Sequence, residues 1–177
     1  MAQNIPPQAN DNDEMLEAME RLARNSQVVR SAHFIAAQRK DKTLKILGVT
    51  VVVINILITS GLVEAALGTN ATAITISIKL LAFLAAALAG IQGFFNFQKI
   101  VECHNRSGST YSSINHRLNL LIAEYQENPA NRPALIDQFK ALNNEYLKAN
   151  DDAANCIPAD KDFDKARAGI EARGGAN

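Results

Sequence analysis

The chain has 177 residues, enough for one domain, and its 18 basic side chains balance its 18 acidic ones. A chain without net charge is not expected to bind nucleic acid. The charges avoid the middle third: residues 1–45 carry 7 basic and 6 acidic side chains and residues 96–177 carry 10 and 11, whereas residues 46–95 contain only Glu64 and Lys79.

Residues 1–12 are polar and expected to be flexible, and residues 13–45 are expected to form a helix. No basic start followed by a short apolar core is present, so no cleavable signal is expected. Seven residues of this helix follow one another at steps of three or four positions, which is the spacing of a packed face. This first seam consists of Met15, Met19, Leu22, Ser26, Val29, His33 and Ala36.

Residues 46–67 and 74–95 are two apolar stretches of about 22 residues, each long enough as a helix to cross the hydrocarbon of a bilayer. Buried core helices are the alternative, but a chain this short has little material to cover two helices that are apolar on every face. The short turn GTNATA between them predicts an antiparallel hairpin. Basic residues flank the hairpin and are absent from the turn, which predicts that both termini are cytoplasmic.

Small residues in the second stretch repeat every four positions along two ridges, which favours close approach of another helix. The first ridge is Ala82, Ala86 and Gly90, and the second is Ala85, Ala89 and Gly93. One ridge can pack within the hairpin, which leaves the other for a second copy of the chain. The predicted packing residues are therefore Ala82, Ala86, Gly90 and Gly93.

Polar residues inside the two stretches are costly if they face lipid. Glu64 and Lys79 fall at similar depth in the predicted hairpin, so they either form an ion pair, reach toward the outer surface or line an aqueous pore. The complete set of candidate pore-lining residues is Asn55, Thr59, Ser60, Glu64 and Lys79.

Residues 96–128 are expected to continue the second span into the cytoplasm, ending at Asn128-Pro129. A second seam runs through Phe97, Val101, His104, Gly108, Tyr111, Asn115, Leu118, Ile122 and Tyr125. Antiparallel pairing places Leu22 near Leu118 and Val29 near Tyr111. Residues 129–172 should form two shorter helices, the second capped by Asp160, and 173–177 a loose tail. The predicted fold is all-α: a two-transmembrane hairpin extended into a cytoplasmic antiparallel bundle.

No nucleotide-binding, zinc-protease or acyl-transfer motif occurs, so no catalytic residue, metal ligand or cofactor is predicted and the chain is not expected to be an enzyme. His33 and His104 lie on facing seams, with Cys103 beside His104, which favours either structural histidines or a metal or proton site. Cys103 and Cys156 have no paired spacing, so neither a disulfide framework nor a CxxC site is predicted, and a reducing cytoplasm is expected.

Three segments resemble the SLATT family, the SMODS- and SLOG-associating two-transmembrane effector domains of bacterial conflict systems. They are RSAHFIAAQRKDKTLKILG before the first span, FQKIVECHNRSGSTYSSINHRL after the second, with His104 seven residues before Tyr111, and NCIPADKDFDKARAGI near the C-terminus. The resemblance covers about residues 20–172. It implies a bacterial inner-membrane effector that perforates or depolarises the membrane during infection, and a separate sensor or nucleotide-second-messenger protein as the trigger.

The sequence therefore leads to the hypothesis of a homo-oligomeric pore-forming effector of antiviral defence by abortive infection, in contact with membrane lipid and opened through its cytoplasmic helices. One alternative is a non-conducting membrane scaffold that docks a partner enzyme. The other is a soluble α-helical toxin that inserts its hairpin later.

Overall fold

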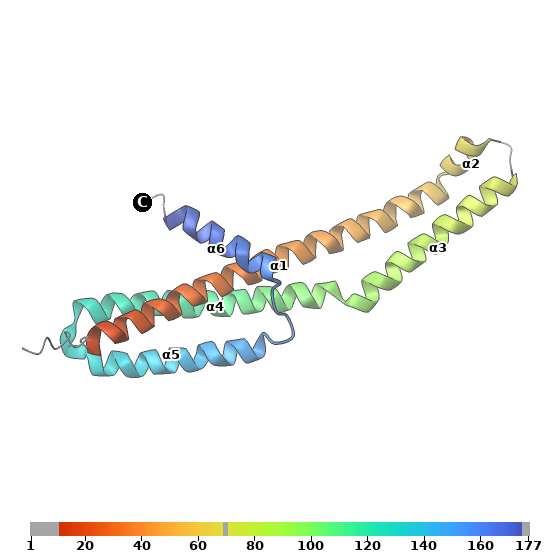
Figure 1. Cartoon of the computed structure of the whole chain (residues 1–177). Helices are drawn as coiled ribbons and strands as arrows, with labels where there is room; N and C mark the ends of the chain where they lie inside the picture. Colours follow the sequence, from red (N-terminus) through yellow and green to blue (C-terminus); the bar gives the residue numbers. More distant parts are fainter. Residues whose placement is uncertain (1–10, 69–70, 175–177) are drawn as a thin grey trace, which may run out of the picture. The chain divides into compact units, whose positions relative to one another are not determined.

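The computed structural model describes residues 11–68 and 71–174, and every regular element in these ranges is helical, which confirms the predicted all-α class. The helices are α1 (Asp11–Thr59), α2 (Leu62–Leu67), α3 (Ala71–Phe95), α4 (Phe97–Glu127), α5 (Arg132–Asp152) and α6 (Asp160–Gly174), with the short 3-10 turn η1 (Pro129–Asn131) before α5 (Figure 1). The chain forms two compact units. The bundle unit comprises the described residues up to Ala36 and from Cys103 onward, and the hairpin unit is Ala37–Glu102.

The bundle unit has one apolar core, to which the N-terminal part of α1, α4 and α5 all contribute (Figure 1). Five of its members belong to the two predicted seams: Met19, Leu22, Tyr111, Leu118 and Tyr125. On the same two helices, Ala23, Ile114 and Leu121 are also buried in the core, although they lie outside the predicted seams. Removing these side chains from water is the main stabilising contribution to such a bundle. The buried set is Met19, Leu22, Ala23, Tyr111, Ile114, Leu118, Leu121, Tyr125, Leu135, Leu142 and Ala149.

The observed contacts between α1 and α4 agree with the predicted antiparallel register to within one helical turn. Asn115 Nδ2 donates a hydrogen bond of 2.8 Å to the Ala23 carbonyl oxygen. A Cβ added to Gly108 would lie 3.0 Å from the ring of Phe34. Glycine at position 108 thus lets the two helices approach closely, and a larger residue would have to displace the ring of Phe34.

A buried carboxylate holds the start of α6. Asp162 is 1 % exposed, and its Oδ2 accepts a hydrogen bond of 3.1 Å from the Ala159 amide. The sequence predicted Asp160 as the cap. Asp162, in the first turn of α6, also stabilises the helix start, because its side chain reaches back to the amide that precedes the helix.

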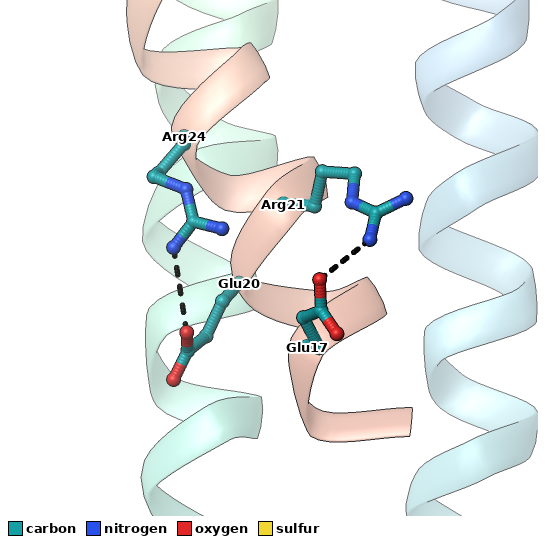
Figure 2. Close-up of polar contacts among 4 residues, drawn as sticks. All are labelled: Glu17, Glu20, Arg21 and Arg24. Atoms are coloured by element: carbon teal, nitrogen blue, oxygen red, sulfur yellow. Dashed lines mark hydrogen bonds and ion pairs between the residues drawn. The ribbon is translucent and has the colours of Figure 1, made fainter. Parts of the chain in front are cut away.

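The exposed face of α1 in the bundle unit carries two ion pairs one helical turn apart (Figure 2). Arg21 contacts Glu17 at 2.7 Å, and Arg24 contacts Glu20 at 3.3 Å. All four side chains are more than 40 % exposed, so each pair contributes only about 0.3–0.5 kcal/mol. They keep this face soluble, while the opposite face packs in the core.

The hairpin unit contains the rest of α1, then α2, α3 and the start of α4 up to Glu102. Helix α1 continues without a break through the predicted border at residues 45 and 46 and ends at Thr59. The prediction of one helix over 46–67 was therefore wrong: Gly61 adopts a left-handed conformation with φ 68°, and α2 starts after it. Glycine takes this conformation without steric cost, and hydroxyl groups at Thr59 and Ser60 bind backbone carbonyls of the preceding turn.

The other boundaries are close to those predicted. The predicted span 74–95 lies inside α3, which ends where Asn96 adopts φ 41°. Asp11 and Asn12 belong to α1 instead of a flexible terminus, and α6 extends to Gly174. Of the segments expected to be flexible, residues 1–10 and 175–177 lie outside the described residues, as does Asn70 in the predicted turn.

Candidate functional site

The hairpin unit exposes large apolar side chains on both of its long helices. On α1, Val49 is 62 % exposed and Ile56 is 55 % exposed; on α3, Phe83 is 73 % exposed and Phe94 is 84 % exposed. Soluble monomers rarely expose contiguous apolar surface of this extent, and such surface marks contact with a membrane or another protein. The exposed set is Ile46, Val49, Val52, Val53, Ile56, Leu62, Leu67, Ile76, Leu80, Phe83, Leu84, Ile91, Phe94 and Phe95.

Two helical stretches are long and apolar enough to cross a membrane, one ending at Thr59 and one beginning at Ala71. In each, only 6 % of the most apolar window is buried within the chain. The core helix of a soluble protein would be mostly buried. Most apolar residues of the hairpin unit therefore lie on its outside, whereas Ile54 and Ala85 are buried.

The two small-residue ridges of α3 differ in exposure at one position. Ala85 of the second ridge is 7 % exposed, whereas Ala89 and Gly93 of the same ridge are exposed, as are Ala82, Ala86 and Gly90 of the first ridge. A Cβ added to Gly90 would meet no atom within 4 Å. The first ridge is thus a surface without bulky side chains that the hairpin itself leaves uncovered.

Residues near the end of the second ridge lie close to α1. A Cβ added to Gly48 would lie 3.7 Å from Gln92 Nε2, and Leu44 lines the same hollow as Ala89 and Gly93. Gly93 itself is exposed, and a Cβ added to it would meet nothing within 4 Å. The helices α1 and α3 thus approach each other at Gly48 and Gln92, whereas Ala89 and Gly93 border a hollow and stay exposed.

The candidate pore-lining residues Asn55, Thr59, Ser60, Glu64 and Lys79 are all exposed. The hydroxyl of Thr59 donates to the Asn55 carbonyl at 2.9 Å, and the hydroxyl of Ser60 lies 3.4 Å from the Leu57 carbonyl. Within the described residues, no ion pair joins Glu64 to Lys79. The hydroxyl groups are thus satisfied by their own helix, which lowers the cost of placing them in an apolar environment.

The bundle unit brings together the three residues singled out on the seams. The Nδ1 atoms of His33 and His104 lie 3.2 Å apart, and both residues are 2 % exposed. The ring of Tyr111 stacks on His33 with centroids 5.5 Å apart. One imidazole must therefore carry its proton on Nδ1 and donate it to the other.

Burial determines the protonation states around this pair. Desolvation, reinforced by the neighbouring His104, lowers the pKa of His33 to about 4, so its imidazole is neutral at pH 7. Burial, with smaller contributions from Tyr146 and Asp152, raises the pKa of Tyr111 to about 12. The Tyr111 hydroxyl stays protonated and donates to Asn150 Oδ1 at 2.6 Å.

A disulfide that the spacing of the cysteines did not predict lies next to the histidines. Cys103 on α4 is bonded to Cys156 in the connection between α5 and α6, with Cα atoms 6.1 Å apart. Cys156 Sγ and one ring nitrogen each of His33 and His104 all lie within 4.8 Å of one another. Ser107 Oγ lies 3.7 Å from Cys156 Sγ. Imidazole nitrogen and cysteine sulfur therefore converge in one buried cluster.

Sequence reasoning placed His33, His104 and Tyr111 correctly on facing helices but missed Cys156 and Asp162. Cys156 lies in the connection before α6, and Asp162 lies near the start of that helix. The sequence there has no clear periodic pattern from which burial could be predicted. The Pro158 that follows Cys156, and the Asp-rich start of α6, were the available signals. They indicate a turn and a helix start, but not burial.

Compared with protein-family models, with curated proteins and with solved structures, the chain shows no significant match. The resemblance to SLATT effectors thus depends on the three sequence segments quoted above. The function has to be inferred from the residues and their arrangement.

Proposed function

We propose that this chain is a homo-oligomeric effector of a bacterial conflict system that inserts its hairpin unit in the inner membrane and perforates or depolarises it. Both termini are then cytoplasmic, and the bundle unit receives the signal from a separate sensor or nucleotide-second-messenger protein. The observation that carries the proposal is the uncovered small-residue ridge of Ala82, Ala86 and Gly90 in the middle of an exposed apolar surface.

Insertion is supported by the exposure of apolar side chains on α1 and α3. In water, each square ångström of such surface costs about 25 cal/mol relative to an apolar environment. Lipid removes that cost, whereas the bundle unit, with its charged exterior, remains in water. In the bundle unit, the part of α1 that carries the exposed Arg21 and Arg24 is suited to water and not to lipid.

Oligomerisation is supported by the ridge itself, because two helices cannot enclose a lumen and a pore needs several copies. Helices in lipid associate through close packing of small residues, and a helix of another copy that packs on Gly90 meets no bulky side chain. Exposed Asn55 and Thr59 then supply polar groups to the interior of the assembly, where water can reach them.

Expression in bacteria loaded with a voltage-sensitive dye tests the proposal. Gly90→Leu fills the ridge and is expected to reduce depolarisation and to shift the protein in detergent toward the monomer. Ala87→Leu is the matched control, because Ala87 is an exposed small residue of the same helix that lies outside the ridge. It should depolarise as the wild type does.

Three outcomes would contradict the proposal. If Gly90→Leu depolarises the membrane as strongly as the wild type, the ridge is not part of the interface between copies. A wild-type chain that is monomeric in detergent and passes no ions in liposomes would favour the non-conducting scaffold. Recovery of the chain from the soluble fraction without detergent would favour a soluble protein that buries its hairpin in another way.

A further inference from the structure

Three buried side chains with metal-binding atoms converge from three separate segments of the bundle unit. His33 comes from α1, His104 from α4 and Cys156 from the connection before α6. Their exposed fractions are 2 %, 2 % and 4 %. The bond to Cys156 also holds the sulfur of Cys103 beside this group. The cluster thus uses both cysteines of the chain and two of its three histidines.

The spacing of the nitrogen atoms suits a tetrahedral ion. Zinc binds imidazole nitrogen at 2.0–2.1 Å, so two nitrogens on one tetrahedral zinc lie about 3.3 Å apart. The Nδ1 atoms of His33 and His104 are 3.2 Å apart. An ion bound by both Nδ1 atoms would replace the single hydrogen bond that joins the two rings.

We propose that the reduced chain binds one zinc-like divalent ion through His33 Nδ1, His104 Nδ1 and the sulfur atoms of Cys156 and Cys103. Two imidazoles with two thiolates form one of the common structural zinc sites. The inference concerns the bundle unit alone and does not rest on the proposed membrane function.

The disulfide and the ion are alternative states of the same four residues. A dithiol reductant supplies two electrons and two protons, becomes a disulfide itself, and leaves Cys103 and Cys156 as thiols. The divalent ion then displaces one proton from each thiol and binds the two thiolates. Oxidation by a disulfide reverses these steps: the two sulfurs bond to each other and the ion leaves.

The contacts of the two histidines with each other and with Tyr111 account for their packing, but not for the two cysteines beside them. The hydrogen bond between the two rings satisfies both Nδ1 atoms, and the stacking of Tyr111 on His33 fills the adjacent space. The contact of Ser107 Oγ with Cys156 Sγ adds a polar partner for the sulfur. Such a partner in the outer shell orients a metal ligand and stabilises its thiolate form.

The test is a titration with Co²⁺, which reports its ligands through visible absorption. The full chain in detergent is treated with chelator and compared in two states, reduced with dithiothreitol and oxidised. The reduced chain is expected to bind one equivalent with the spectrum of tetrahedral cobalt and a thiolate charge-transfer band, and Zn²⁺ should displace the cobalt. The oxidised chain should show neither feature.

Four variants identify the ligands. Cys103→Ser and Cys156→Ser should each weaken the charge-transfer band, while His33→Asn and His104→Asn should weaken binding by about 10-fold or more. His116→Asn is the matched control, because His116 is the third histidine and is exposed. Its titration should match that of the wild type, and circular dichroism checks the helix content of every variant.

A measurement on the wild type covers the case in which a variant fails to fold. Zn²⁺ should slow alkylation of the two reduced thiols by iodoacetamide on the order of 10-fold or more, and a chelator should restore the rate. The proposal is overturned if the reduced wild type gives no thiolate band, if Zn²⁺ leaves alkylation unchanged, or if folded His33→Asn and His104→Asn bind cobalt as the wild type does. Loss of binding in His116→Asn overturns it as well.

Discussion

The hydroxyl of Tyr111 donates a hydrogen bond of 2.6 Å to Asn150 Oδ1, and this contact joins α4 to the end of α5. Tyr111 is 1 % exposed, so its ring belongs to the core, while Asn150 lies at the surface. One residue thus contacts the ring of His33 on α1, the ring of Tyr146 and the side chain of Asn150 on α5.

We predict that Tyr111→Phe lowers the free energy of unfolding by about 0.5–1.5 kcal/mol, since the ring packing stays and one hydrogen bond is lost. Thermal unfolding in detergent, followed by circular dichroism, measures the change. Because Asn150 is reached by water, no buried acceptor is left without a partner. A loss well above this range would show that the Tyr111 hydroxyl has a larger role than the bond to Asn150.

The raised pKa of Tyr111 predicts a loss of stability in alkali. Its folded-state pKa of about 12 exceeds the unfolded value of about 10, so the folded state holds the proton more tightly. The stabilising contribution is complete below pH 10 and decreases as the pH rises toward 12. Tyr111→Phe should flatten this dependence, and it should remove phenolate absorbance that emerges near pH 12 in the wild type.

We predict that Gly108→Ala destabilises the bundle unit by about 1 kcal/mol. The new Cβ would lie 3.0–3.2 Å from three ring atoms of Phe34, and overpacking of this kind costs about 1–3 kcal/mol, partly offset by the better helix propensity of alanine. Gly169→Ala is the control, since its nearest atom would be the end of Arg173 at 3.9 Å. Phe34→Leu in the Gly108→Ala background should restore the stability; failure to do so would mean that the clash is elsewhere.

Asp162 and Asp164 on α6 allow a buried and an exposed carboxylate of the same helix to be compared by mutation. Asp162→Ala should cost about 1–3 kcal/mol, because it leaves the Ala159 amide without the acceptor that the buried carboxylate provides. Asp164 is exposed and pairs with Arg167 at 3.4 Å, so Asp164→Ala should cost less than about 0.5 kcal/mol. Equal effects in thermal unfolding would contradict the role assigned to the buried side chain.

If the reduced chain binds zinc as proposed, the ion should stabilise it. A free concentration 100 times the dissociation constant adds about 2.7 kcal/mol, which raises the unfolding temperature by several degrees. Chelator should remove the increase, and the oxidised chain should not respond to either reagent. An equal response of both forms would place the ion outside the cysteine cluster.

The packing of α1 on α4 was predictable because residues at steps of three or four positions mark one face of each helix. The face comprises seven residues of α1 and nine of α4. His33 and His104 lie on those faces, so their proximity followed from the register. The break at Gly61 was not predictable in the same way. Thr59 and Ser60 precede it and Leu62 follows it in an otherwise apolar stretch, and hydropathy does not distinguish a continuous helix from one interrupted by a left-handed glycine.

Cys156 and Asp162 show a different limit of the sequence. Cys156 lies in the connection between α5 and α6, where side-chain direction depends on the local turn and has no period, and Asp162 lies in the first turn of α6, where a carboxylate is usually exposed. Cysteine spacing was uninformative because the partners are 53 residues apart, on segments that only the folded bundle brings together. Their burial depends on tertiary packing.

The glycine that separates α1 from α2 sets a limit on how thick a bilayer the hairpin unit can span. From Ile46 to Thr59 an ideal helix rises about 20 Å, whereas average hydrocarbon is about 30 Å thick, and α3 with its 25 residues rises about 36 Å. The backbone around Gly61 needs hydration, since a break in a helix leaves amide groups without partners. If the hairpin unit inserts as proposed, the membrane beside α1 would therefore thin by several ångströms, and this hydrophobic mismatch favours clustering of neighbouring copies.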